Sequence, residues 1–191
     1  MRSGAAVILV AVAAYAPWHA ANAEDALDGL MQQLAARRHG QVSFHELHWS
    51  ALLEHPLESS GELVYDAPDR LEQHTVTPRP ETLVLDHGTI TVQRGKRRYV
   101  LALADYPEVG ALVDSIRATL AGDRATLERS FRVAFEPGGA AWTLRLEPRE
   151  ARLARLVSRI VITGSADALA TVEITRADGD HSLLTIGSSA R

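Results

Sequence analysis

The sequence predicts an α+β fold in which an antiparallel β-sheet is accompanied by a few helices. Apolar and polar side chains alternate through most of the chain beyond residue 60; Phe131, Val133 and Phe135, for example, share one face. Such alternation is typical of strands that are buried on one face and wet on the other. Two further segments space their apolar residues as a helix does, and Asp178-Gly179 offers a hairpin turn.

Length, charge and cysteine content narrow the possible functions. The chain has 191 residues, 46% of them hydrophobic, which is enough for one domain with a real core, or at most two small domains. It carries 20 basic and 24 acidic residues with no basic block, so nucleic acid is not an expected partner. The absence of cysteine excludes disulfides, thiolate metal sites, a cysteine nucleophile and an N-terminal lipid-modified cysteine.

Residues 1–23 are expected to be a cleaved signal peptide. Arg2 is followed by an apolar run from Gly4 to Ala16, and Ala21-Asn22-Ala23 is a small-x-small cleavage site. The alternative is a membrane anchor, but Pro17 interrupts the run before the roughly 20 apolar residues that an anchor needs. Residues 24–191 would then form a single domain, most simply in the periplasm of a Gram-negative cell, with a secreted product as the alternative.

The first predicted helix of that domain has one apolar stripe. Leu27, Leu30, Met31 and Leu34 follow the i, i+3, i+4, i+7 spacing, and acidic residues precede them, where the helix dipole favours negative charge. We expect Gly40 to end this helix.

A second amphipathic helix is predicted in the middle of the chain, between Pro107 and Gly122. Its stripe contains Val109, Leu112, Val113, Ile116 and Leu120, and a short polar helix over 123–129 follows it. Alternation predicts strands at 61–65, 82–85, 89–92, 97–103, 131–136, 142–146, 156–162, 171–175 and 184–186.

The predicted sheet has more apolar face than its helices can cover. About nine strands give an apolar face of roughly 700 Å². The two amphipathic helices cover about 440 Å² of it. Two solutions stay open at this point: the sheet covers itself as a sandwich or closed barrel, or it is cupped and leaves an apolar pocket beneath a helical lid.

No catalytic or metal-binding motif is present, so we predict no catalytic residues, no metal and no cofactor. His45 and His48 would point to opposite faces of a strand. Glu46 would share a face with Val42 and Phe44, either as an acid, base or polar anchor in a pocket or as an edge residue facing water. A run of arginines is either a solvated face or a patch for an acidic partner, and it consists of Arg145, Arg149, Arg152, Arg155 and Arg159.

The order of several short motifs resembles the LolA family of periplasmic lipoprotein carriers, in its divergent LolA-related branch, which is found beside lipid and aryl-polyene pigment biosynthesis genes. The resemblance covers essentially all of the chain after the signal peptide. The segments that carry it are 60–65 (SGELVY), 68–71 (PDRL), 81–88 (ETLVLDHG), 120–123 (LAGD), 131–133 (FRV), 142–148 (WTLRLEP), 160–164 (IVITG) and 177–180 (ADGD).

The resemblance implies an incomplete antiparallel β-barrel whose helical lid encloses an apolar cavity for acyl chains. It implies no enzymatic activity, an acylated cargo, an inner-membrane donor and an outer-membrane acceptor, and we expect a monomer. The lid face would contain Leu112, Val113 and Ile116. The lipid-binding residues would be Phe131, Val133, Phe135, Trp142, Leu144, Ile160, Ile162, Val172 and Ile174.

Two positions depart from the typical family pattern. Where typical lipoprotein carriers have a lid-latching arginine before the turn proline, this chain has Ala67, and where they have a tryptophan after it, this chain has Gln73. The resemblance therefore allows a glycolipid or pigment lipid as cargo as well as a lipoprotein. Two alternatives are a periplasmic accessory protein with a filled core that binds a protein partner, and a lipid-modifying enzyme that uses Glu46 and a nearby histidine.

Overall fold

The structure is a computed structural model that describes residues 18–187. The apolar run of the predicted signal peptide lies outside the described residues, and the predicted cleavage site falls within the first helix. Among the described residues, no helix is long and apolar enough to cross a membrane.

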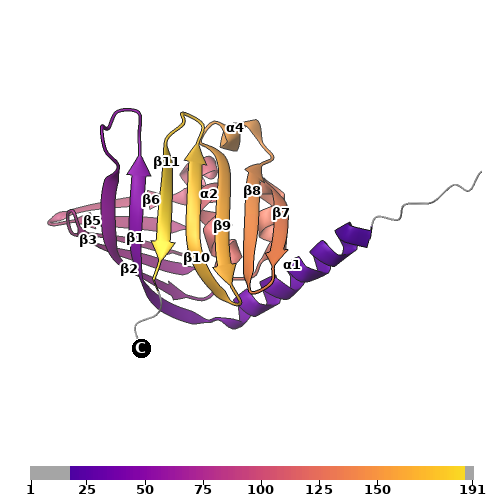
Figure 1. The fold of residues 1–191 in the computed structure, drawn as a ribbon. Coiled ribbons are helices and arrows are strands. Elements are labelled where there is room, and N and C mark those ends of the chain that lie inside the picture. The colour runs from indigo at the N-terminus through magenta and orange to yellow at the C-terminus, as the bar shows by residue number, and fades with distance from the viewer. Residues whose placement is uncertain (1–17, 188–191) are drawn as a thin grey trace, which may run out of the picture.

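One antiparallel sheet of eleven strands dominates the fold (Figure 1). Its spatial order is β6-β5-β4-β3-β2-β1-β11-β10-β9-β8-β7, so β6 and β7 are unpaired edges and the sheet is not a closed barrel. This confirms the predicted α+β class and the incomplete barrel. The strands are β1 (His39–Trp49), β2 (Leu57–Asp66), β3 (Arg70–Thr77), β4 (Glu81–Asp86), β5 (Thr89–Arg94), β6 (Arg97–Ala102), β7 (Phe131–Gly138), β8 (Ala141–Pro148), β9 (Val157–Ser165), β10 (Ala168–Arg176) and β11 (His181–Ile186).

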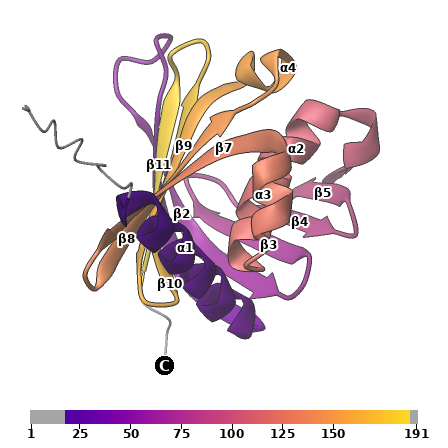
Figure 2. The ribbon, with the colours of Figure 1, turned by 90° about the vertical axis from the view of Figure 1, so that its right-hand side faces the viewer.

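The helices lie on one side of the sheet, which bends around them (Figure 2). They are α1 (Trp18–Ala36), a 3-10 turn (Leu103–Asp105), α2 (Pro107–Leu120), α3 (Arg124–Ser130) and α4 (Ala151–Ala154). Helices α1 and α3 contact β7, and α4 contacts β8 and β9. The helices thus cover the β7–β9 end of the curved sheet.

The predicted α1 stripe is confirmed, since Leu27, Leu30, Met31 and Leu34 are all buried. The predicted end of this helix at Gly40 is wrong. Helix α1 ends at Ala36, and β1 begins before Gly40, which pairs with Tyr65 of β2.

Strand β3 was not predicted, because most of its residues are polar. It has the sequence RLEQHTVT, in which Leu71 and Val76 are the aliphatic residues. Pairing with β2 and β4 on both sides makes this segment a strand despite its weak pattern.

The main core fills the space between α1 and the β7–β9 part of the sheet. Leu34, Leu144, Leu146, Ile160 and Ile162 are at most 1% exposed. Full burial of a Leu or Ile side chain contributes about 1.5–3 kcal/mol, so this cluster is the principal source of stability.

The Asp123 carboxylate caps the N-terminus of α3. It accepts hydrogen bonds from the Thr126 hydroxyl and from the Thr126 backbone N–H, the latter at 3.0 Å. These hydrogen bonds hold the pKa of Asp123 below its ordinary value. A lowered folded-state pKa means that the carboxylate stabilises the fold above its ordinary pKa. That contribution is lost as the pH falls through the lowered value.

We therefore expect Asp123→Ala to lower the free energy of unfolding by about 1 kcal/mol at pH 7 and by less at pH 3. Asp123→Asn keeps a capping oxygen without a titrating group, so its smaller loss should not change with pH in this range. Urea unfolding of the three proteins at both pH values measures this. An equal loss for the alanine variant at pH 7 and pH 3 would contradict the assigned role.

Candidate functional site

A half-open pocket of about 520 Å³ lies between the curved sheet and the helices. Its volume falls in the range of about 300–1,000 Å³ that is common for small-molecule sites. Strands β1 to β5 and β9 to β11 contribute to its wall, together with α2 and the C-terminal end of α1. Its larger apolar side chains are Leu34, Val42, Leu63, Val64, Leu71, Leu83, Leu85, Ile90, Val113, Ile116, Leu120, Leu169, Val172, Ile174, Leu184 and Ile186.

Strand register explains why so many apolar residues meet in this pocket. Leu184 lies directly opposite Val172 on one side and Glu46 on the other, and directly paired residues share a face of the sheet. On the other half of the sheet, Tyr65, Leu71 and Leu85 form one such row across β2, β3 and β4. The alternation seen in the sequence therefore assembles one apolar inner face.

Helix α2 divides its larger apolar side chains between the pocket and the core, and Ile116 contacts both. Val113, Ile116 and Leu120 line the pocket and are only half-buried. The fully buried residues of this helix are small ones, including Ser115 and Ala118. The predicted lid residues thus divide: Val113 and Ile116 line the pocket, and Leu112 packs against the core.

The predicted lipid-binding residues also divide into two groups. Register places them all on the inner face, but only Val172 and Ile174 line the pocket. The other seven belong to the packed core or lie against it, because helices cover the sheet there: Phe131, Val133, Phe135, Trp142, Leu144, Ile160 and Ile162.

Trp142 illustrates the structural role of the second group. It is 6% exposed, and its indole N–H donates a hydrogen bond to the carbonyl of Ala166 at 2.9 Å. A Cβ atom on Gly164 would lie 2.2 Å from the indole ring, so the two residues are closely packed. The ring is therefore packed against Gly164, and Trp142 does not line the pocket.

An ion pair lies at the end of the pocket that α1 reaches. Arg37 Nη2, just beyond α1, donates to Asp167 Oδ2 at 2.8 Å, and both residues line the pocket. The hydrogen bond from Arg37 lowers the pKa of Asp167. The pair therefore ties the end of α1 to the β9–β10 turn.

Glu46 also lines the pocket. Its carboxylate accepts a hydrogen bond from the Ser59 hydroxyl at 3.3 Å. Of the two options that the sequence left open for this residue, the structure supports a polar group in the pocket wall. His48 lies 4.0 Å from Asp180, measured from Nε2 to Oδ2.

Tyr65 is a pocket residue that sequence reasoning missed. The residue is 6% exposed, and its hydroxyl is buried without a hydrogen-bond partner. Burial raises the pKa of the phenol, so the group stays protonated at neutral pH. No sequence signal distinguishes Tyr65 from an ordinary strand tyrosine, because the missing partner depends on neighbours from other strands.

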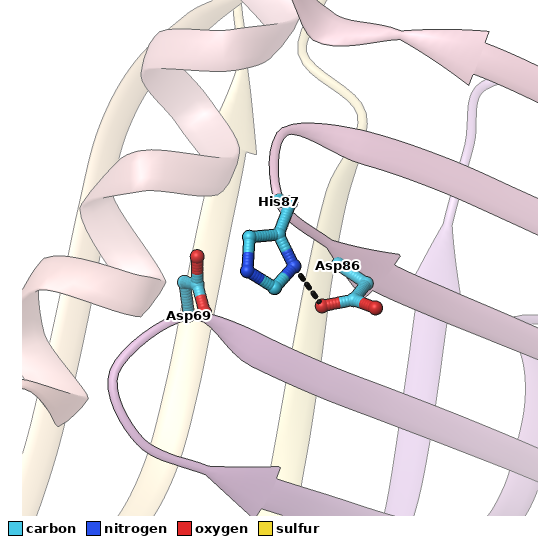
Figure 3. A group of neighbouring side chains, drawn as sticks. All are labelled: Asp69, Asp86 and His87. Carbon is cyan, nitrogen blue, oxygen red and sulfur yellow. Dashed lines mark hydrogen bonds and ion pairs between the residues drawn. The ribbon is translucent and has the colours of Figure 1, made fainter.

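One group of side chains within residues 18–187 has the spacing of a metal site (Figure 3). It consists of Asp69, Asp86 and His87, near the turns that join β2 to β3 and β4 to β5. Asp86 already pairs with His87 at 2.7 Å and with Arg70 at 3.1 Å. These contacts account for both carboxylate oxygens of Asp86, so we assign no metal to this group.

The arginine run is divided between structural contacts and exposed positions. Arg145 pairs with a glutamate on β7, and Arg149 donates to the carbonyl of Phe131 at 2.9 Å. Arg152, Arg155 and Arg159 are exposed.

The sequence and the fold were both compared with those of known proteins. Over residues 19–191 the chain matches the family described as outer membrane lipoprotein carrier protein LolA-like. Among solved structures, a LolA superfamily protein from Nitrosomonas europaea is similar with a TM-score of 0.45 and 10% identity, covering 88% of this chain and 93% of that chain. A DUF1329 family protein from Desulfovibrio piger gives 0.41 and 9%, covering 87% and 91%.

LprF from Mycobacterium bovis is similar with a TM-score of 0.35 and 12% identity, covering 86% of this chain and 93% of that chain. No curated protein matches the chain. The family match extends over nearly the whole sequence and agrees with the incomplete barrel. The chain therefore belongs to the LolA-like family of outer membrane lipoprotein carrier proteins, in its divergent branch.

Proposed function

We propose that this protein is a non-enzymatic periplasmic carrier that binds the acyl chains of a lipoprotein or another lipidated molecule and delivers them towards the outer membrane. One observation carries the proposal. The half-buried apolar side chains of α2 face an apolar sheet wall across an open pocket of about 520 Å³. Apolar surface left unfilled in this way is stabilised when a hydrocarbon chain occupies it.

The energetics suit a ligand that is taken up and released. Each CH₂ group that leaves water contributes about 0.8 kcal/mol, so an acyl chain needs an apolar wall more than it needs many polar contacts. The pocket is half-open, and α2 contacts the other helices and takes no part in strand pairing. A shift of α2 can therefore admit or release a chain while the sheet stays intact.

Two sequence positions bear on the cargo. Ala67 has no charged side chain with which to latch a lid, and Gln73 lines the pocket in place of the typical tryptophan. We therefore include glycolipids and pigment lipids among the proposed cargoes. In this proposal residues 1–23 direct export, residues 24–191 form a monomeric carrier domain, and an inner-membrane donor and an outer-membrane acceptor exchange the cargo with it.

Native mass spectrometry of the mature protein, purified from periplasm without detergent, tests the proposal. We expect a stoichiometric acylated adduct that organic extraction releases and lipid analysis identifies. A clean apo mass, combined with no uptake of a fluorescent long-chain acyl probe, would contradict it. That result would favour the accessory-protein alternative, which the same sample tests by salt-sensitive capture of a protein partner.

A further inference from the structure

Tyr65 lines the pocket, and its hydroxyl is buried without a hydrogen-bond partner. Across the sheet, Tyr65 lies in a row with Gly40, Leu71, Leu85 and Ile90, all of which line the pocket. None of these four neighbours has a polar side chain. The row therefore supplies no side-chain acceptor to the phenol.

The lack of a partner is unusual enough to need an explanation. Among the described residues that are not exposed, this hydroxyl is the one side-chain polar group that is buried and unpaired. Buried polar groups in folded proteins nearly always have a partner, because leaving one unsatisfied is costly. A Tyr65 hydroxyl that stays unpaired is therefore expected to destabilise the fold.

We propose that the Tyr65 hydroxyl donates a hydrogen bond to the carbonyl oxygen of the ester or amide that attaches a bound acyl chain to its cargo. This inference rests on the proposed function and adds a contact that recognises acyl chains over plain alkyl chains. A carbonyl is the acceptor that every acyl chain carries at its end. The rest of the chain can then lie along Leu71, Leu85 and the apolar face of α2, which also border the pocket.

The protonation state of the phenol supports this role. Burial raises its pKa, against the opposing influence of Arg38 and Arg117, so the hydroxyl keeps its proton. Because the hydroxyl is shielded from solvent, a ligand reaches it only after the covering groups shift. Helix α2 is the side of the pocket that can move without breaking strand pairs.

A pair of lipids that differ at one group tests the proposal. Palmitoyl lysophosphatidylcholine has an ester carbonyl, and its hexadecyl ether analogue has a CH₂ group at the same position. Both are measured below their micellar concentrations by displacement of a fluorescent acyl probe. We expect the parent protein to bind the ester roughly three- to tenfold more tightly than the ether.

Tyr65→Phe should remove this preference by weakening ester binding, while ether binding stays unchanged. Tyr99→Phe is the matched control, because Tyr99 is exposed on β6 and does not line the pocket. It should keep the preference. Without ligand, Tyr65→Phe should also raise the midpoint of thermal unfolding by about 2–4 °C, because it removes an unpaired buried hydroxyl.

The outcomes separate the two levels of inference. Equal binding of ester and ether by the parent protein would overturn the role of Tyr65 and leave the carrier proposal standing. The same holds if Tyr65→Phe retains the ester preference. If the parent binds neither lipid nor the acyl probe, the carrier proposal fails and the role of Tyr65 fails with it.

Discussion

Replacing Gly122 with alanine is expected to lower the free energy of unfolding by about 2–5 kcal/mol. Gly122 ends α2 with a φ of +65°, and the N–H groups of Gly122 and Asp123 bond back to the carbonyls of Thr119 and Ala118. A Cβ atom at Gly122 would lie 2.0 Å from the carbonyl oxygen of Met31 in α1. The change therefore adds backbone strain and also pushes α1 away from the α2–α3 turn.

Gly139→Ala is the matched control for this prediction. Gly139 has a similar φ of +73°, but a Cβ atom there would meet nothing within 4 Å. The Gly139→Ala variant should lose only the free energy of unfolding that a left-handed backbone conformation costs an alanine, about 1–2 kcal/mol. Urea unfolding of both variants measures the difference. Equal losses for the two variants would contradict the prediction, because they would mean that the steric conflict between a Cβ atom at Gly122 and α1 costs no stability.

Replacing Leu184 with glutamate is expected to weaken acyl-chain binding at least about a hundredfold. Leu184 lies in the pocket wall, directly opposite both Glu46 and Val172. The new carboxylate would remove apolar contact area, hold water in the pocket and face a second negative charge. Titration with a fluorescent long-chain acyl probe measures the effect.

Thr185→Glu places the same charge one residue further along β11. Thr185 is exposed on the outer face of the sheet, so this variant should bind the probe as the parent does. Circular dichroism and thermal unfolding of both variants show whether they are folded. A folded Leu184→Glu variant with parental affinity would contradict the assignment of this pocket as the acyl-chain site.

The inner-face residues show how far sequence patterns reach. Alternation in 131–136 and 171–175 places Phe131, Val133, Val172 and Ile174 on the apolar face, and strand pairing in the structure confirms this. The alternation in the sequence does not indicate which part of that face a helix covers. Phe131 therefore became part of the core, whereas Val172 and Ile174 line the pocket.

For helix α2, too, the sequence predicted the element but not what its apolar side chains would face. Its spacing predicted both the helix and its apolar stripe, which the structure confirms over Pro107–Leu120. An apolar stripe normally faces a core. Here Val113 and Ile116 line a half-open pocket. This could not be predicted because the position of α2 depends on contacts with other helices, such as the close approach of Gly122 to α1.

The sequence by itself determined the α+β class, the two amphipathic helices and the residues that share the apolar face, because these depend on local periodicity. The tertiary structure decided which strands form the open edges of the sheet, that helices fill only the β7–β9 end, and that Tyr65 is left without a partner. These features depend on which distant segments pack together, and nearest-neighbour patterns along the chain carry no information about that packing.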